Sequence, residues 1–271
     1  MLEGNSVSVE GGRGRTWAEG APSGLAAAYD RHFGVHACDD PASLERAYRL
    51  RYQVYCVENP FEDPADNPQE LERDGYDVRS AHSLLSHRAS GRLVGAVRLI
   101  LPDSERPRAS FPMQEVCADP RIADPAVFPV RHAAEVSRFC VSREFRRRLG
   151  EARYADVGEA EARARAAEER RLMPYVTLGL IRGLVRMSVE HGVRHWCIVV
   201  EPPLLRLLKT LGFVFENLGP LVQHHGLRQP CHADLERLLD GVRRLRPDVW
   251  EVVTDRGALW RALFEPARAA A

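Results

Sequence analysis

Charged side chains stand where this sequence otherwise predicts buried strands and helices, and they are the first candidates for chemistry. The segment Glu135-Val136-Ser137-Arg138-Phe139 lies in an apolar stretch that predicts a strand. Four more charged residues lie beside or inside apolar segments upstream: Arg51, Asp74, Asp77 and Arg98. Ionised groups are rarely buried unless they are paired or functional. The set therefore predicts a charged constellation lining one cleft, where a carboxylate can act as an acid or base.

Composition restricts the class of protein to which the chain can belong. Its 271 residues are 45% hydrophobic and 28% charged, as is ordinary for a soluble globular protein. The 38 basic and 38 acidic residues balance, so nothing global indicates binding to nucleic acid or to an anionic surface. No apolar run approaches the ~18 residues that a transmembrane helix needs, and the N-terminus lacks the pattern of a signal peptide. We expect no nucleic-acid partner and no integral membrane association.

The cysteines and histidines give no sign of a metal or disulfide framework. The six cysteines contain no CxxC spacing, and most fall in apolar runs: Cys38, Cys56, Cys117, Cys140, Cys197 and Cys231. We expect buried free thiols, which fits a reducing, cytoplasmic location. His224, His225 and His232 lack the spacing of metal ligands, so no metal site is predicted.

Helical and strand patterns position the charged residues. Residues 43–58 carry an apolar stripe next to Arg51, residues 82–87 and 93–101 predict a hairpin, and residues 133–142 predict a strand. Downstream, the patterns predict a helix from Pro174 to Gly192, a strand at 195–200, a helix at 204–211, strand-like segments at 214–216 and 221–225, and a helix at 234–245. Residues 248–264 give no clear pattern. This order predicts an α+β or mixed α/β fold.

The domain boundaries follow from composition. Residues 1–24 contain six glycines and almost no large apolar side chains, so we expect residues 1–28 to be a disordered lead. Residues 29–245 form the predicted domain, and 246–271 a C-terminal extension. Residues 146–171 are rich in Ala, Glu and Arg and are either a solvated helix or a mobile insertion.

The spaced charged set resembles a known group of enzymes. The residues Tyr48-Arg49-Leu50-Arg51-x3-Tyr55, Asp74-x2-Asp77, Val97-Arg98-Leu99 and Glu135-x-Ser137-Arg138-Phe139 are similar to the pattern of acyl-homoserine-lactone (autoinducer) synthases and long-chain N-acyl amino acid synthases. The amino-acid sequence of residues 48–58 and 135–141 most resembles that of the acyltransferases associated with bacterial PEP-CTERM/exosortase systems. The resemblance covers roughly residues 30 to 240. The order of a helix, an apolar strand and a second helix that ends in Leu211-Gly212-Phe213 resembles the second half of the GNAT fold. It implies a GNAT-like three-layer α/β/α sandwich with a central mixed, mostly antiparallel sheet.

The resemblance also implies an activity. It is that of an N-acyltransferase, which moves a fatty acyl group from the thioester of acyl carrier protein or coenzyme A to the amine of an amino acid or similar small acceptor. The donor is then an acyl-phosphopantetheine thioester, and no tightly bound cofactor is expected. No convincing Gly-rich pyrophosphate loop follows the Glu135 strand, which favours a carrier protein as partner. Autoinducer synthases carry a tryptophan near the S-adenosylmethionine site where this chain has Phe61, so S-adenosylmethionine is in doubt as acceptor.

The same resemblance assigns roles to residues. Glu135 is the predicted general base for a neutral amine, and Ser137 and Arg138 complete the predicted catalytic set. The predicted substrate-binding residues are Arg51, Tyr55, Phe61, Asp74, Asp77, Arg98 and Phe139, and the predicted carrier-protein docking residues are Arg143, Arg146, Arg147 and Arg148. A buried ion-pair network and a solvated basic face are the structural alternatives. Acyl-homoserine-lactone synthesis and a non-catalytic acyl-thioester-binding module are the functional ones.

Overall fold

The computed structural model describes residues 24–143, 145, 160–224 and 226–265. Predictions about the lead before residue 24, about the first part of the charged insertion, and about docking by Arg146, Arg147 and Arg148 lie outside these ranges.

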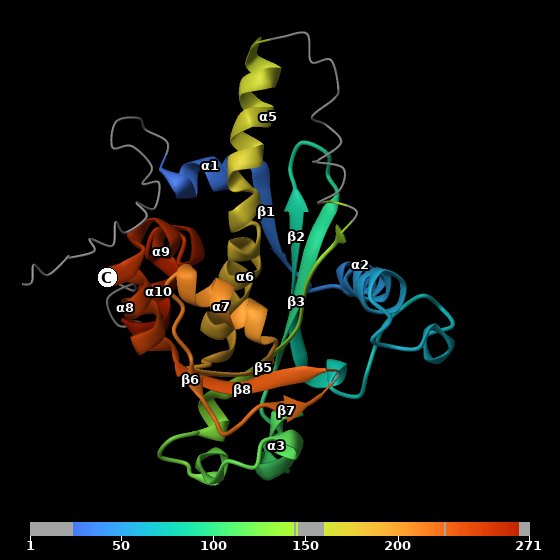
Figure 1. Cartoon of the computed structure of the whole chain (residues 1–271), viewed down its shortest axis with the longest axis vertical. Coiled ribbons are helices and arrows are strands. Elements are labelled where there is room, and N and C mark those ends of the chain that lie inside the picture. The colour runs from blue at the N-terminus through green and yellow to red at the C-terminus, as the bar shows by residue number, and fades with distance from the viewer. Residues whose placement is uncertain (1–23, 144, 146–159, 225, 266–271) are drawn as a thin grey trace, which may run out of the picture.

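One mixed sheet organises the described residues (Figure 1). Its strands are β1 (Phe33–Ala37), β2 (Ser80–His87), β3 (Leu93–Ile100), β4 (Ala133–Val141), β5 (His195–Val200), β6 (Glu216–Asn217), β7 (Val222–Gln223) and β8 (Leu227–Asp234). The order is β1-β2-β3-β4-β5-β8-β6, and β7 pairs with β8. Every pair is antiparallel except β4 with β5. The predicted mixed, mostly antiparallel sheet is confirmed.

Helices cover both faces of this sheet and complete three layers (Figure 1). They are α1 (Leu25–His32), α2 (Pro41–Tyr52), α3 (Met113–Val116), α5 (Ala160–Leu172), α6 (Thr177–His191), α7 (Pro202–Thr210), α8 (Leu235–Leu245), α9 (Pro247–Val253) and α10 (Ala258–Phe264). Helix α6 packs on β1, β2 and β3 on one face, with α9 and α10 behind it, and α2 packs on β2 and β3 on the other. The α+β sandwich predicted from the sequence is therefore confirmed.

Helix α6 is the central helix, and small residues let it approach the sheet closely. A Cβ on Gly183 would lie 2.4 Å from Ser83 Oγ, and one on Gly179 would lie 2.4 Å from Leu85 Cδ1. Gly192 ends the helix at φ 64°, a left-handed conformation that glycine adopts without strain. No single helix in the described ranges is long and apolar enough to cross a membrane. In those ranges, one pair of consecutive helical segments, 167–175 and 177–191, has the required length and composition when taken together, but the chain bends by 54° between them.

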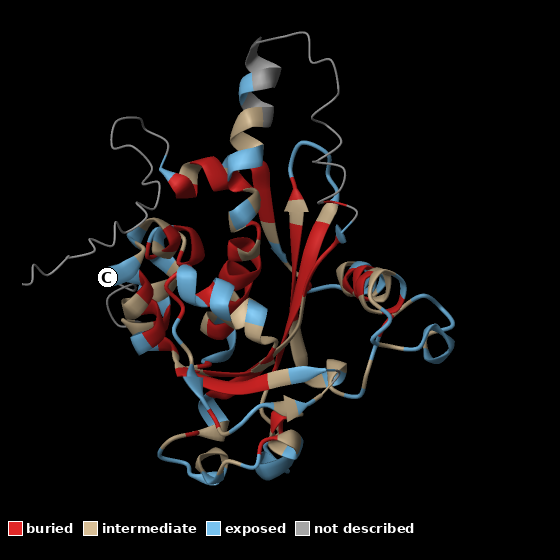
Figure 2. Ribbon diagram, in the orientation of Figure 1, coloured by how far each residue is buried: buried red, intermediate tan, exposed pale blue. Residues whose placement is uncertain are grey.

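Both predicted ends of the domain are wrong, because the chain joins the core earlier and leaves it later. Helix α1 begins at Leu25, and Leu25 and Ala28 are buried, so the predicted lead through residue 28 extends too far. Helices α9 and α10 pack on α6, and Val249 and Val252 are fully buried. Figure 2 shows this buried face in red. The predicted C-terminal extension is thus part of the domain up to the last described residue.

The sequence patterns missed one long strand and misjudged one helix. Strand β8 was not predicted because Pro230 interrupts it and proline is rare inside sheets. Here the Pro230 carbonyl accepts from the Leu218 N–H at 2.9 Å, so the strand keeps part of its hydrogen bonding. The single helix predicted over 43–58 is α2 followed by a π-helical turn, η1 (Gln53–Glu58). The described part of the charged insertion is helix α5, and all six cysteines are buried and free, as predicted.

Candidate active site

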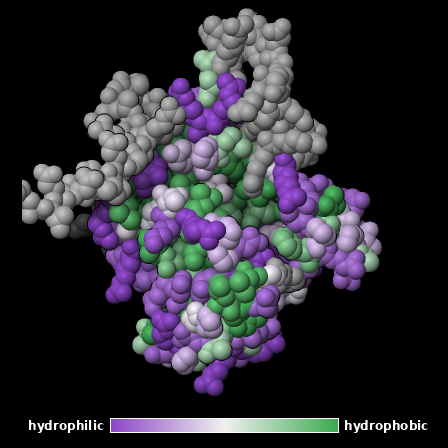
Figure 3. All heavy atoms as spheres, in the orientation of Figure 1, coloured by the Kyte–Doolittle hydropathy of each residue, from purple (hydrophilic) through white to green (hydrophobic). Residues whose placement is uncertain are grey.

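The two parallel strands of the sheet separate, and a cavity opens between them. Strands β4 and β5 pair from Ala133 with His195 to Val136 with Ile198. Beyond these residues each strand continues without pairing to the other, and both line a cavity of about 550 Å³. Its apolar wall includes Val136, Phe139, Ile181, Leu184, Trp196 and Phe213. Figure 3 shows apolar side chains gathered where this face is hollowed, between α7 and α2.

A bulge in β4 sets the direction of the Arg138 side chain. Arg98 of β3 pairs with Ser137, and Ala96 pairs with Cys140, so two β4 residues oppose the single Val97. Arg138 adopts φ 50°, a left-handed conformation that is costly for a residue with a Cβ. Side chains normally alternate along a strand, but the extra residue turns Arg138 to the same face as Ser137. Strain of this kind often marks functional positions.

Arg51 is the buried centre of an ion-pair network on that face. Its side chain, 1% exposed, donates from Nε to Glu72 Oε2 at 2.5 Å. Its Nη1 and Nη2 atoms donate to the two carboxylate oxygens of Asp77 at 2.7 and 3.2 Å. Burial disfavours the charge of Arg51, but its bonds to Asp77 and Glu72 outweigh burial and raise its pKa. The guanidinium therefore stays charged inside the protein.

Arg98 connects this network to strand β4. It is also 1% exposed, and its Nε donates to Ser137 Oγ at 2.9 Å. Its Nη1 donates to Asp74 Oδ1 at 2.6 Å and to Asp77 Oδ1 at 2.7 Å. Asp77 in turn accepts from the backbone N–H of Asp74 at 2.8 Å. The structure thus brings four residues of the predicted constellation together, namely Arg51, Asp74, Asp77 and Arg98.

Two acidic residues of this site were not identified from the sequence patterns. Glu72, 2% exposed, bridges Arg51 and Arg138, accepting from Arg138 Nη2 at 2.8 Å. Glu62 accepts from the same Nη2 at 3.2 Å. Both lie in the Pro- and acid-rich stretch 59–73, which reads as a solvated loop. Because that stretch has no periodicity, no pattern in the sequence points to these two residues.

The carboxylates of this site fall into two electrostatic classes. Burial acts to raise the pKa of Glu72, but hydrogen bonds from Arg138 and Arg51 hold it below its ordinary value. The pKa values of Asp74 and Asp77 are also lowered, by Arg98 and Arg51 respectively, against the effect of burial. Glu135 differs: burial raises its pKa to about 7, and one backbone hydrogen bond and more distant arginines only partly oppose this. The ion-pair network is therefore ionised, while Glu135 is poised to exchange a proton near neutral pH.

The predicted site residues divide between the cavity and the network behind it. Glu135, Ser137 and Arg138 line the cavity, together with Tyr55, Phe61 and Phe139. The other predicted substrate-binding residues, Arg51, Asp74, Asp77 and Arg98, do not line it and are used in mutual ion pairs. The Arg138 guanidinium lies 5.4 Å from the centre of the Tyr55 ring, so it joins the network to the cavity wall. The geometry therefore favours a role for Arg51, Asp74, Asp77 and Arg98 in holding Ser137 and Arg138 at the cavity, rather than in contacting a substrate.

Arg143, the described member of the predicted docking set, lies at the cavity rim. Its backbone N–H donates to Glu58 Oε2 at 2.8 Å, and its Nη1 donates to the Glu58 carbonyl at 2.9 Å. It therefore ties β4 to the end of η1, and its role in docking stays a prediction.

Comparisons with known proteins bear on the fold of the chain. Residues 50–155 match the family described as acetyltransferase (GNAT) domain. No curated protein sequence matches significantly. The solved structure of TofI in a ternary complex with an inhibitor and MTA is similar, with 21% identity, a TM-score of 0.51, and coverage of 80% of this chain and 99% of that one.

Two other solved structures are similar over comparable lengths. BjaI, a CoA-dependent acyl-homoserine lactone synthase with SAM and isopentyl-CoA, has 19% identity, a TM-score of 0.50, and coverage of 79% and 88%. FeeM, an N-acyl amino acid synthase from uncultured soil microbes, has 13% identity, a TM-score of 0.49, and coverage of 79% and 97%. At these identities, the likeness to TofI and BjaI shows the fold alone. The described chain therefore has the GNAT fold that the sequence predicted, with a GNAT domain match over residues 50–155.

Proposed function

We propose that this protein is an acyltransferase that moves a fatty acyl group from a phosphopantetheine thioester to the amine of an amino acid or similar small acceptor. One observation carries the proposal: the cavity between the separated ends of β4 and β5 joins an apolar chamber to the buried carboxyl of Glu135. An acyl chain suits the chamber, and a proton acceptor with a pKa of about 7 suits an amine nucleophile.

The proposed reaction needs only groups that meet at this cavity. The neutral amine attacks the thioester carbonyl, a C–N bond forms, the C–S bond breaks, and Glu135 takes the amine proton. The thiolate leaves and is protonated to the thiol. The β4 backbone beyond Val136 has no strand partner on its β5 side in the described chain, so its N–H groups there can stabilise the oxyanion. Ser137 accepts a hydrogen bond from Arg98 and lines the cavity, and it is the proposed hydrogen-bond partner of the carbonyl or the pantetheine.

Charge is the basis for the proposed acceptor and donor. Arg138 is the member of the arginine network that reaches the cavity, so it is the proposed contact for an acceptor carboxylate. An acyl carrier protein is the proposed donor, with Arg143 and the adjacent Arg146, Arg147 and Arg148 as its docking residues. We further propose that the enzyme acts in the cytoplasm and is of the PEP-CTERM/exosortase-associated type that its sequence resembles.

The test is acyl transfer by the purified full chain. A long-chain acyl carrier protein or acyl-CoA is mixed with single amino acids, and thiol release and product mass are measured. Amine-dependent thiol release with an N-acyl product supports the proposal, and Glu135→Gln should lower its rate at least 100-fold at pH 8. Release of methylthioadenosine with S-adenosylmethionine as acceptor would instead show acyl-homoserine-lactone synthesis. Thioester binding without any turnover would show a non-catalytic binding module.

A further inference from the structure

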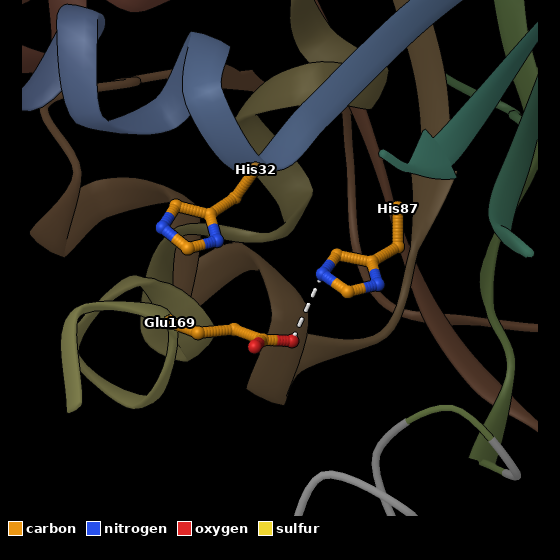
Figure 4. Close-up of side chains that lie close together, drawn as sticks. All are labelled: His32, His87 and Glu169. Carbon is orange, nitrogen blue, oxygen red and sulfur yellow. Dashed lines mark ion pairs between the residues drawn. The ribbon is translucent and has the colours of Figure 1, made fainter. Parts of the chain in front are cut away.

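Three potential metal ligands meet at a second, separate place in the fold (Figure 4). His32 ends α1, His87 ends β2, and Glu169 lies on α5. One ligand atom from each lies within 4.8 Å of the others. His32 and His87 are 4% and 6% exposed. None of the three lines the cavity at Glu135, so this cluster is independent of the proposed function.

Each imidazole is held through one nitrogen, which leaves the other for a ligand. His32 Nε2 lies 3.0 Å from Glu168 Oε2, and His87 Nδ1 lies 2.9 Å from Ser90 Oγ. Figure 4 shows the other nitrogen of His32, Nδ1, on the side that faces His87 and Glu169. Metal-binding histidines are characteristically oriented in this way, by a carboxylate or another polar group on the second nitrogen.

Two buried atoms of the cluster lack a hydrogen-bond partner. His87 Nε2 and Glu169 Oε1 face each other at 3.0 Å, an ion-pair distance, yet both are buried without a hydrogen bond of adequate geometry. Buried polar atoms without a well-formed hydrogen bond destabilise a fold. A cation that both atoms coordinate would remove this destabilisation for both.

We propose that His32 Nδ1, His87 Nε2 and a carboxylate oxygen of Glu169 bind a divalent transition-metal ion of the Zn²⁺ type. Two imidazoles and one carboxylate are a common donor set for Zn²⁺, with water in the fourth position. The ligand atoms of tetrahedral Zn²⁺ lie roughly 3.3 Å from one another, so side-chain rotations that move these atoms by about 1 Å would bring all three to the ion. The ion would connect α1, the end of β2 and α5, three elements that lie far apart in the sequence. That distance explains why sequence spacing predicted no metal.

The test uses the full chain, stripped with a chelator and titrated with ZnCl₂ alone. We expect one Zn²⁺ per chain by calorimetry and elemental analysis, and a higher melting temperature with Zn²⁺. Glu169→Gln and His87→Gln should each weaken binding at least tenfold and remove the thermal shift. His36→Gln is the matched histidine control, since His36 lies on neighbouring β1 and bonds Ser86 Oγ at 2.8 Å; it should bind as the wild type does.

The outcomes separate the metal site from an ordinary ion pair. If His87→Gln fails to fold, Glu169→Gln decides the question, because glutamine keeps the size of the side chain and removes only its charge. The proposal is overturned if the wild type takes up no Zn²⁺, or if Glu169→Gln binds Zn²⁺ as tightly as the His36→Gln control.

Discussion

The carboxylate of Glu135 accepts a hydrogen bond from the backbone N–H of Met113 at 2.8 Å. That N–H opens α3, and no ion pair to Glu135 is present among the residues that the structure describes. The nearby arginines Arg98 and Arg138 instead donate to other carboxylates. Glu135 is therefore buried beside the network without being neutralised by it. This separation leaves burial free to raise the pKa of Glu135, while the arginines lower the pKa values of Glu72, Asp74 and Asp77.

The first prediction concerns the pH dependence of acyl transfer. We expect the ratio of wild-type to Glu135→Gln rates to be small below pH 5 and to rise through pH 7, because only ionised Glu135 accepts the proton. Using the ratio cancels the ionisation of the acceptor amine, which is common to both proteins. Measurements of kcat/KM from pH 5 to 9 check this. A ratio that does not change with pH would remove Glu135 from the proton transfer.

The second prediction concerns how the stability of the protein depends on pH. The raised pKa of Glu135 affects stability in the opposite direction to the lowered pKa values of Glu72, Asp74 and Asp77. Folded Glu135 binds its proton more tightly than unfolded glutamate does, so the contribution of this group to the free energy of unfolding is lost as pH rises from about 4.5 to 7. The shift from 4.5 to about 7 corresponds to about 3 kcal/mol. Glu135→Gln should therefore unfold at higher urea than the wild type at pH 8, and at similar urea at pH 4. Equal midpoints at pH 8 would contradict the raised pKa.

The third prediction concerns Glu72, which the sequence did not reveal. Glu72→Gln leaves Arg51 and Arg138 short of one buried negative charge, and breaking a buried pair costs about 3–5 kcal/mol. Urea unfolding at pH 7 should show a loss of this order. Glu45→Gln is the matched control, because its pair with Arg49 is exposed and contributes about 0.3–0.5 kcal/mol. Similar losses in the two variants would show that the network does not stabilise the fold.

The sequence was most informative where apolar periodicity and charge coincide. The hairpin of β2 and β3, the β4 strand with Glu135, and the meeting of Arg51, Asp77 and Arg98 all follow from such positions. The bulge at Arg138 could not be predicted, because it depends on a register between strands that are far apart in the chain. Without the bulge, alternation would turn Arg138 toward α6, so its bonds to Glu72 are a tertiary property.

Other features escaped prediction for the same physical reason. Glu72 has no local pattern, and it reaches Arg51 and Arg138 only because the loop at 59–73 folds back on α2. There the Glu72 N–H donates to the Tyr48 carbonyl at 3.2 Å. Helices α9 and α10 are short, and their apolar residues face α6 rather than forming a long stripe. Short elements of this kind are fixed by tertiary packing, which overrides local propensity.

The fourth prediction concerns the apolar chamber. Leu184 lies on α6 and lines the cavity, so Leu184→Phe should narrow the chamber without changing charge near Glu135. We expect kcat/KM for long acyl donors to fall at least tenfold while short donors are used normally, because added volume excludes only the end of a long chain. Overpacking also costs about 1–3 kcal/mol of stability, so melting temperatures must be measured alongside. Leu207→Phe on α7, which is exposed and outside the cavity lining, is the control and should keep the wild-type chain-length profile. An equal fall for short and long donors in Leu184→Phe would mean that the chamber does not hold the acyl chain.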